Sequence, residues 1–215
     1  MKNKIIYEII KKKIIIIIRG VERERLIPLA EALYKGGIRF VEITYCADGS
    51  ISDEVTADNI RLLCEAFEGR MTIGAGTVLT KEQVKLTSEA GGKFIISPDT
   101  NEEVIKETVK QGLVSIPGAL TPTEAQSAHK YGADFIKLFP VSNFGHSYVK
   151  ALSAPLSHLK FLAVGGVNEK NIADFLKAGA VGVGIGGNIT TLLKNGDYSA
   201  ITELAKKYVE ESNIG

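Results

Sequence analysis

The chain has 215 residues, of which 45% are hydrophobic and 24% are charged, and its formal net charge is +1. This near-neutral balance gives no reason to expect nucleic acid or an acidic surface as a partner. Two cysteines, Cys46 and Cys64, are too few for a disulfide framework, and the longest apolar run, Ile14–Ile18, is too short to span a bilayer. With no secretory signal at the N-terminus, we expect a cytoplasmic protein that does not associate with membranes.

Short β-branched segments alternate with amphipathic segments along the whole chain. After a basic leading helix at 1–13, this pattern predicts strands at 14–19, 38–44, 71–75, 93–97, 113–116, 133–138, 160–164 and 181–185. Each strand is followed by a predicted helix, at 21–35, 52–67, 81–90, 102–111, 123–131, 146–153, 168–178 and 198–211. Eight βα units with right-handed crossovers make a (β/α)8 TIM barrel of the α/β class, and residues 1–215 are predicted to form a single domain.

Lys137 stands in the middle of a predicted strand that is otherwise apolar. With a strand period of two, Phe135, Lys137 and Phe139 share one face. Burial of an unpaired ammonium is costly, and it lowers the pKa so that part of the population is free amine, the form that a Schiff-base lysine requires. The alternative is a structural lysine whose head pairs with a carboxylate, because ion pairs also perturb pKa values.

Polar side chains end the other predicted strands, where the active site of such a barrel lies. Arg19 ends the first strand, Glu42 is near the end of the second, and Thr77 follows the third in Gly74-Ala75-Gly76-Thr77. These residues gather around one rim with Lys137, which favours a ligand site over an isolated structural ion pair.

Two diglycines follow the last two predicted strands. Gly165-Gly166 precedes a helix expected at Asn168, and Gly186-Gly187-Asn188 follows the eighth strand. Backbone N–H groups and helix N-termini at these places often bind a phosphate, although the glycines could instead serve only strand-to-helix packing. A deep lysine, a carboxylate, an arginine and a phosphate cradle together suit imine chemistry on a phosphorylated keto acid.

Metal and nicotinamide chemistry have no support in the sequence. The three histidines lack a paired ligand spacing, and 184–187 lacks the third glycine and the acidic residue of a dinucleotide fingerprint.

Six short motifs resemble those of the class I 2-keto-3-deoxy-6-phosphogluconate (KDPG) / 4-hydroxy-2-oxoglutarate (KHG) aldolases, and they occur in the family's order. They are 41–44 (VEIT), 74–78 (GAGTV), 96–98 (ISP), 116–118 (IPG), 137–140 (KLFP) and 165–167 (GGV). The resemblance covers nearly the whole chain. It implies a homotrimeric barrel without a metal or organic cofactor, acting on a small phosphorylated keto acid.

The resemblance also implies roles for individual residues. Lys137 would form the Schiff base and Glu42 would be the general acid/base. The substrate carboxylate would lie near Arg19 and Thr77. The remaining substrate-binding positions are the pocket walls Pro98 and Phe139, Val164, and the phosphate-site residues Gly165, Gly166, Gly186, Gly187 and Asn188, the last standing where some members have serine.

Two positions depart from the KDPG-cleaving members. Cys46 replaces an arginine that holds the carboxylate in some members, so Arg19 must serve instead. Val164 replaces a threonine before the diglycine, as in the branch that cleaves the C4 epimer, 2-keto-3-deoxy-6-phosphogalactonate. A lost hydroxyl contact there could relax or invert discrimination at C4.

The resemblance thus implies an aldehyde-lyase that cleaves KDPG to pyruvate and glyceraldehyde 3-phosphate, with cleavage of KHG to pyruvate and glyoxylate as a second activity. The alternatives are a 6-phosphogalactonate aldolase, a sugar-phosphate epimerase on the same barrel, and a sugar-phosphate-binding barrel without turnover.

Overall fold

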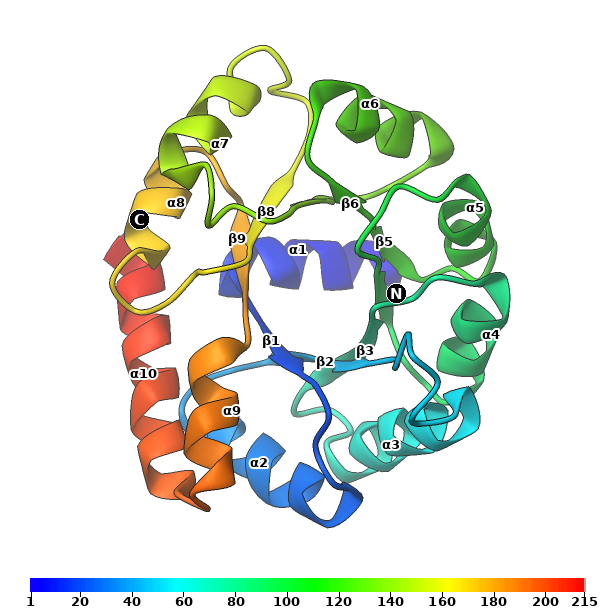
Figure 1. The fold of residues 1–215 in the computed structure, drawn as a ribbon, viewed down its shortest axis with the longest axis vertical. Helices are drawn as coiled ribbons and strands as arrows, with labels where there is room; N and C mark the ends of the chain where they lie inside the picture. The colour runs from blue at the N-terminus through cyan, green and yellow to red at the C-terminus, as the bar shows by residue number, and fades with distance from the viewer. Residues whose placement is uncertain (215) are drawn as a thin grey trace.

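The computed structural model describes residues 1–214, whose strands are all parallel and form a nearly closed barrel (Figure 1). The strands run in the order β5-β4-β3-β2-β1-β9-β8-β7-β6. Their bounds are β1 (Ile14–Ile18), β2 (Phe40–Thr44), β3 (Thr72–Gly76), β4 (Phe94–Ile96), β5 (Val114–Ile116), β6 (Gly118–Ala119), β7 (Ile136–Leu138), β8 (Phe161–Val164) and β9 (Gly182–Ile185).

The sheet has nine strands rather than the eight expected, because Pro117 divides the fifth into β5 and β6. Proline has no N–H to donate to a neighbouring strand, so the ladder is interrupted at that residue. β5 pairs with β4 and β6 pairs with β7, so the ring continues through Pro117, whose carbonyl accepts the Lys137 N–H at 2.8 Å.

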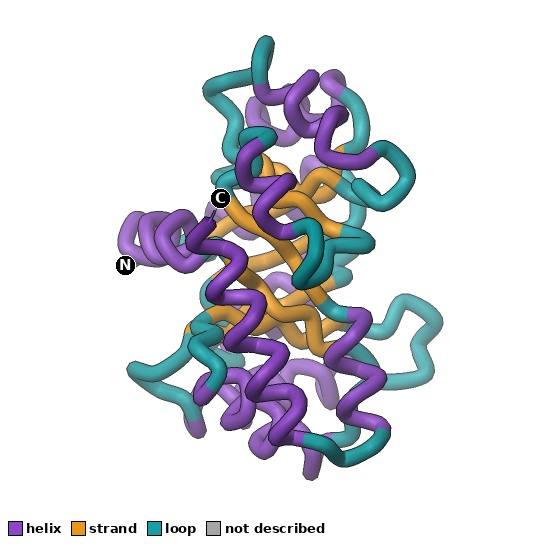
Figure 2. The backbone as a smooth tube through the Cα atoms, turned by 90° about the vertical axis from the view of Figure 1, so that its left-hand side faces the viewer, coloured by secondary structure: helices purple, strands orange, loops and turns teal. Residues whose placement is uncertain are grey.

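A ring of helices surrounds the barrel (Figure 1). It consists of α2 (Arg23–Lys35), α3 (Asp53–Ala66), α4 (Lys81–Glu89), α5 (Glu102–Lys110), α6 (Pro122–Tyr131), α7 (Gly145–Ser153), α8 (Ile172–Lys177), α9 (Gly187–Lys194) and α10 (Tyr198–Ile214). α1 (Lys2–Lys12) lies instead across one end of the barrel, to one side of the strands (Figure 2). Within residues 1–214, no helix is both long and apolar enough to cross a membrane.

The core has two layers because side chains alternate along each strand. Val41, Ile43, Ile136 and Leu138 point outward and pack in the layer beneath the helices. The inward layer fills the end of the barrel that α1 covers, and it consists of Ile9, Ile15, Phe40, Phe94, Ile96, Val114, Ile116, Phe135 and Leu162. This apolar plug leaves the opposite, C-terminal end of the barrel for polar side chains.

The loops after β8 and β9 differ from expectation. α8 begins at Ile172 rather than at Asn168, because the side-chain amides of Asn168 and Asn171 both donate to the carbonyl of Gly166 and form a turn before the helix. α9 is an additional helix between β9 and α10 that the periodicity did not separate from the loop.

Candidate active site

Glu42 and Lys137 point into the barrel from opposite sides. Glu42 is on β2 and Lys137 on β7, with β1, β9 and β8 between them in one direction and β3, β4 and the divided β5–β6 strand in the other. Both occupy inward positions one step beyond the apolar plug, Glu42 after Phe40 and Lys137 after Phe135. The expected alternation of inward and outward residues on these two strands is therefore correct.

Lys137 is held in a dry environment. Only 7% of the residue is exposed, and Nζ lies 4.7 Å from the centroid of the Phe139 ring. Burial lowers the pKa of this amine, the Glu42 carboxylate opposes that shift, and the Arg19 guanidinium adds to it. The net direction is downward, towards a larger fraction of free amine.

Glu42 is more deeply buried, with 2% of the residue exposed. Its Oε2 has no hydrogen-bond partner, and burial raises its pKa to about 7 although Lys137 and Arg19 both favour the charged form. The side chain lies against the backbone of Gly76, where an added Cβ would collide with Oε1 of Glu42. Glycine is needed at position 76 because any side chain there would clash with Glu42, and not because of the backbone conformation.

The two ionisable groups do not form an ion pair within residues 1–214, and a cavity lies between them. Its walls are Glu42, Lys137 and the apolar residues Ile15, Ile17, Ile96, Ile116, Leu162, Val164 and Gly184. A buried amine and a buried carboxyl group thus face one small apolar space. This arrangement can bind a carbonyl compound covalently and move a proton beside it.

Arg19 and Thr77 meet at the rim above this cavity. The Arg19 guanidinium donates to Oγ1 of Thr77 at 3.1 Å. Thr77 has a φ of 54°, the left-handed region that a β-branched residue seldom adopts. The structure therefore brings together the two residues expected to hold a carboxylate.

The diglycine loops lie next to each other on the same rim, because β8 pairs with β9. Gly165 and Gly166 both have positive φ, at 97° and 76°, so other residues would be strained there. Gly165-Gly166 leads into the Asn168 turn and not directly into a helix, which corrects the first of the two expected phosphate cradles. At the second, Gly186 is the N-cap of α9, a helix that the periodicity did not predict.

Asn188, in the first turn of α9, donates from Nδ2 to the Glu169 carboxylate of the neighbouring loop at 3.3 Å. This acidic neighbour of the candidate phosphate site had no signal in the sequence, because contact between the two loops depends on strand order. The two residues expected as pocket walls are not among those that line the small cavity: Pro98 is half-buried, and Phe139 is 37% exposed beside Lys137.

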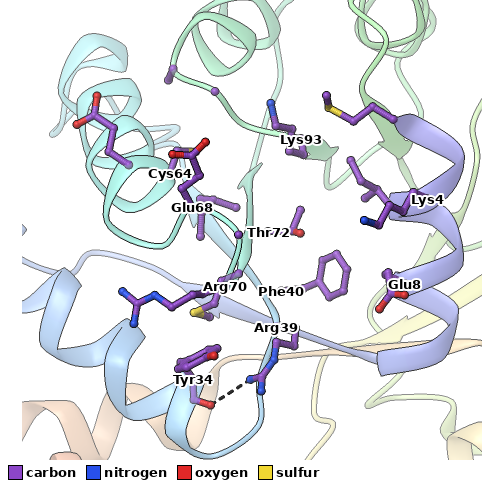
Figure 3. A pocket seen from close by; sticks show the side chains of 18 of the residues that line it. Lys4, Glu8, Tyr34, Arg39, Phe40, Cys64, Glu68, Arg70, Thr72 and Lys93 are labelled. Atoms are coloured by element: carbon purple, nitrogen blue, oxygen red, sulfur yellow. Dashed lines mark hydrogen bonds between the residues drawn. The ribbon is translucent and has the colours of Figure 1, made fainter.

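A larger pocket, with a volume of about 1020 Å³, lies at the other end of the barrel beneath α1 (Figure 3). Lys4 and Glu8 of α1 face Phe40 and Thr72 across it, and Arg39 donates to the Tyr34 carbonyl at its edge. Neither Glu42 nor Lys137 lines this pocket. The smaller cavity is therefore the candidate active site, since it alone of the two contains the buried amine and carboxyl group.

This chain is similar in sequence and in structure to known aldolases. The 2-dehydro-3-deoxy-6-phosphogalactonate aldolase of Escherichia coli K12 is 36% identical over 180 residues, which cover 83% of this chain and 85% of that protein. The KHG/KDPG aldolase of the same organism is 33% identical over 195 residues, covering 89% and 88%. A crystal structure of KDPG aldolase from Legionella pneumophila, with pyruvate captured as a covalent carbinolamine intermediate, has a TM-score of 0.81 and 33% identity, covering 91% of this chain and 93% of that one.

A parallel α/β barrel with two buried ionisable groups facing one cavity at its C-terminal strand ends is typical of an enzyme. The family model for KDPG and KHG aldolases matches residues 5–204. The chain belongs to this aldolase family, and it is a lyase of the pyruvate-dependent aldolase type.

Proposed function

We propose that the chain, as a single aldolase domain over residues 1–215, cleaves a 2-keto-3-deoxy-6-phosphosugar acid to pyruvate and glyceraldehyde 3-phosphate through a Schiff base on Lys137. The observation that carries this proposal is the facing pair of Lys137 and Glu42, both buried, on either side of one cavity. Burial favours the free amine at Lys137 and a carboxyl group at Glu42 that exchanges its proton near neutral pH.

The chemistry follows from these two groups. The Lys137 amine adds to the C2 ketone to form a carbinolamine. The carbinolamine hydroxyl takes a proton from solvent and leaves as water, which gives a protonated imine. The Glu42 carboxylate takes the proton of the C4 hydroxyl while the C3–C4 bond breaks, and the bonding electrons move to the imine to form an enamine. Protonated Glu42 then returns the proton to C3, and hydrolysis releases pyruvate and the free lysine.

Residues at the rim of the barrel would bind the substrate. Arg19 and Thr77 would hold the substrate carboxylate. Pro98 and Phe139 would form the walls, and the phosphate would lie against the two loops that contain Gly165, Gly166, Gly186, Gly187 and Asn188. The pyruvate carbinolamine of the Legionella pneumophila relative supports the covalent step, since it is an intermediate of the same reaction type.

The configuration preferred at C4 depends on Val164. Its side chain lines the cavity and offers no hydroxyl to the substrate, which favours 6-phosphogalactonate as a second candidate beside KDPG. The relative at 36% identity acts on that epimer by its name, and the relative at 33% acts on KDPG, so both are assigned here as candidate substrates. Cleavage of unphosphorylated KHG to pyruvate and glyoxylate belongs to the same proposal, as does the homotrimer that the family resemblance implies.

Borohydride reduction in the presence of pyruvate tests the covalent step. We expect mass spectrometry to find a stable pyruvate adduct on the peptide that contains Lys137. Lys137→Met should form no adduct, whereas Lys93→Met, a change at a half-buried lysine of the other pocket, should form it normally. An active wild-type protein without an adduct would exclude the imine route.

A further inference from the structure

Thr77 is held in a backbone conformation that its side chain disfavours. A β-branched residue at a φ of 54° relaxes unless the surrounding chain fixes it. Its hydroxyl accepts the hydrogen bond from Arg19, so any relaxation of this loop would move the partner of that guanidinium. Other groups must therefore hold the β3–α4 loop in place.

Gln83, on the first turn of α4, is the side chain that holds this loop. It is 7% exposed, and its Oε1 accepts from the backbone N–H of Leu79, two residues after Thr77, at 2.8 Å. Its Nε2 donates to Oδ1 of Asp53, the first residue of α3, at 3.0 Å. Only this orientation of the amide satisfies both partners, because the Leu79 N–H needs an acceptor and the Asp53 carboxylate needs a donor.

The same residue is anchored to the end of β2. The Gln83 carbonyl accepts from the hydroxyl of Tyr45 at 3.1 Å, and the Tyr45 N–H donates to the carbonyl of Gly76 at 2.9 Å. Gln83 is thus bonded to α3, to the β2 end and to the loop that follows Thr77. Buried and fully bonded side-chain networks of this kind hold a single conformation.

We propose that Gln83 is a positioning residue for the Arg19–Thr77 pair. Its amide bridges Leu79 and Asp53 and so keeps Thr77 in the left-handed conformation in which the Thr77 hydroxyl accepts from Arg19. The inference rests on the proposed function, in which Arg19 and Thr77 hold the substrate carboxylate. Gln83 does not line the cavity between Glu42 and Lys137 and has no part in the covalent step.

The test compares two ketones that have the same keto group and differ in the charge at C1. Pyruvate carries the carboxylate, and methyl pyruvate presents the same keto group with a neutral ester. Borohydride trapping rates on Lys137 are measured for both, together with kcat and KM for cleavage. In Gln83→Leu we expect the trapping rate with pyruvate to fall about tenfold while that with methyl pyruvate stays unchanged, and KM to rise with little change in kcat.

A double variant that exchanges the donor and the acceptor between positions 83 and 53 should restore the bridge. Gln83→Glu alone sets two carboxylates against each other and should lose the preference for pyruvate. Adding Asp53→Asn restores a donor opposite the new acceptor, so the double variant should recover the preference. Asp53→Asn alone should retain it, because the asparagine carbonyl still accepts from Gln83.

Thr108→Val is the matched control for a buried hydrogen bond lost elsewhere. Thr108 lies on α5, and its hydroxyl donates to the carbonyl of Val104 at 2.7 Å. We expect it to lower stability without altering the ratio of the two trapping rates. Equal losses with both ketones in Gln83→Leu, or no rescue by the double variant, would overturn the inference. A wild-type protein that traps no pyruvate would instead overturn the proposed function.

Discussion

Glu42 and Lys137 face each other across the barrel from opposite strands, yet they form no ion pair. A close ion pair would fix both groups in their charged forms and raise the pKa of the amine. Separation by an apolar cavity has the opposite effect, since burial then dominates at each group: it lowers the pKa of Lys137 and raises that of Glu42 to about 7. The arrangement sacrifices electrostatic stability. In exchange, Glu42 can carry or lose a proton near neutral pH, and Lys137 holds its proton less tightly than an exposed lysine does.

The raised pKa of Glu42 predicts an acidic limb in the pH profile of cleavage. Glu42 must be ionised to accept the C4 hydroxyl proton, so kcat/KM should fall as pH drops below about 7. Glu42→Gln should slow cleavage by about a hundredfold or more and remove this limb, while pyruvate trapping on Lys137 continues. Steady-state kinetics from pH 5 to pH 9 would check this, and a limb that persists in Glu42→Gln would assign it to another group.

The same burial predicts that Glu42 destabilises the fold at high pH. Its folded-state pKa of about 7 lies above the ordinary value of 4.5, so the stability contributed by the bound proton is complete below pH 4.5 and is lost as pH rises to about 7. Glutamine stays neutral throughout. Glu42→Gln should therefore gain about 3 kcal/mol relative to the wild type between pH 4 and pH 8.

Urea unfolding at several pH values measures this difference. Glu210→Gln, at an exposed position on α10, controls for the change in net charge. A stability difference between Glu42→Gln and the wild type that does not vary with pH would mean that Glu42 is not desolvated in solution.

The sequence was sufficient for the alternation of strands and helices, the inward faces and the residues at the strand ends, because period-two alternation and the shared direction of parallel strands follow from local pattern. Its count of eight strands is one short of the nine in the sheet. Phe40, Glu42, Phe135 and Lys137 lie on the faces that this alternation predicts. The interruption at Pro117 follows from the missing N–H of proline, and the late start of α8 at Ile172 follows from the bonds that the Asn168 and Asn171 side chains make to the Gly166 carbonyl. The periodicity of apolar residues carries no information about either.

Contacts between elements that lie far apart in the chain also could not be predicted from the sequence. The collision that excludes a side chain at Gly76 involves β2, and the Gln83 bridge joins α4 to α3. The glycines of Gly74-Ala75-Gly76 allow another group to approach the backbone closely, and the structure shows that the Glu42 carboxylate is the group that lies against Gly76.

Gly76→Ala should damage catalysis more than stability. The new methyl group would meet the Glu42 carboxylate, which has to move within a closed pocket, and a displacement of about 1 Å at a catalytic group costs about a hundredfold in rate. Gly74→Ala is the control, since it lies on the same face of β3 and would collide with the Phe94 ring instead. Both variants should lose stability, and kcat per folded molecule should fall sharply only in Gly76→Ala.

Val164→Thr tests which C4 epimer the site prefers. Valine and threonine have nearly the same shape, so the change adds one hydroxyl to the cavity wall without altering its volume. A hydroxyl that bonds the C4 group of one epimer contributes about 1 kcal/mol, which corresponds to roughly a fivefold change in the ratio of kcat/KM values. We expect the ratio of KDPG to 6-phosphogalactonate cleavage to rise, as measured by pyruvate release from each epimer.

Ile17→Val, a change in the cavity wall that adds no hydroxyl, should leave the ratio unaltered. An unchanged ratio in Val164→Thr would place the selection of the C4 epimer at another residue.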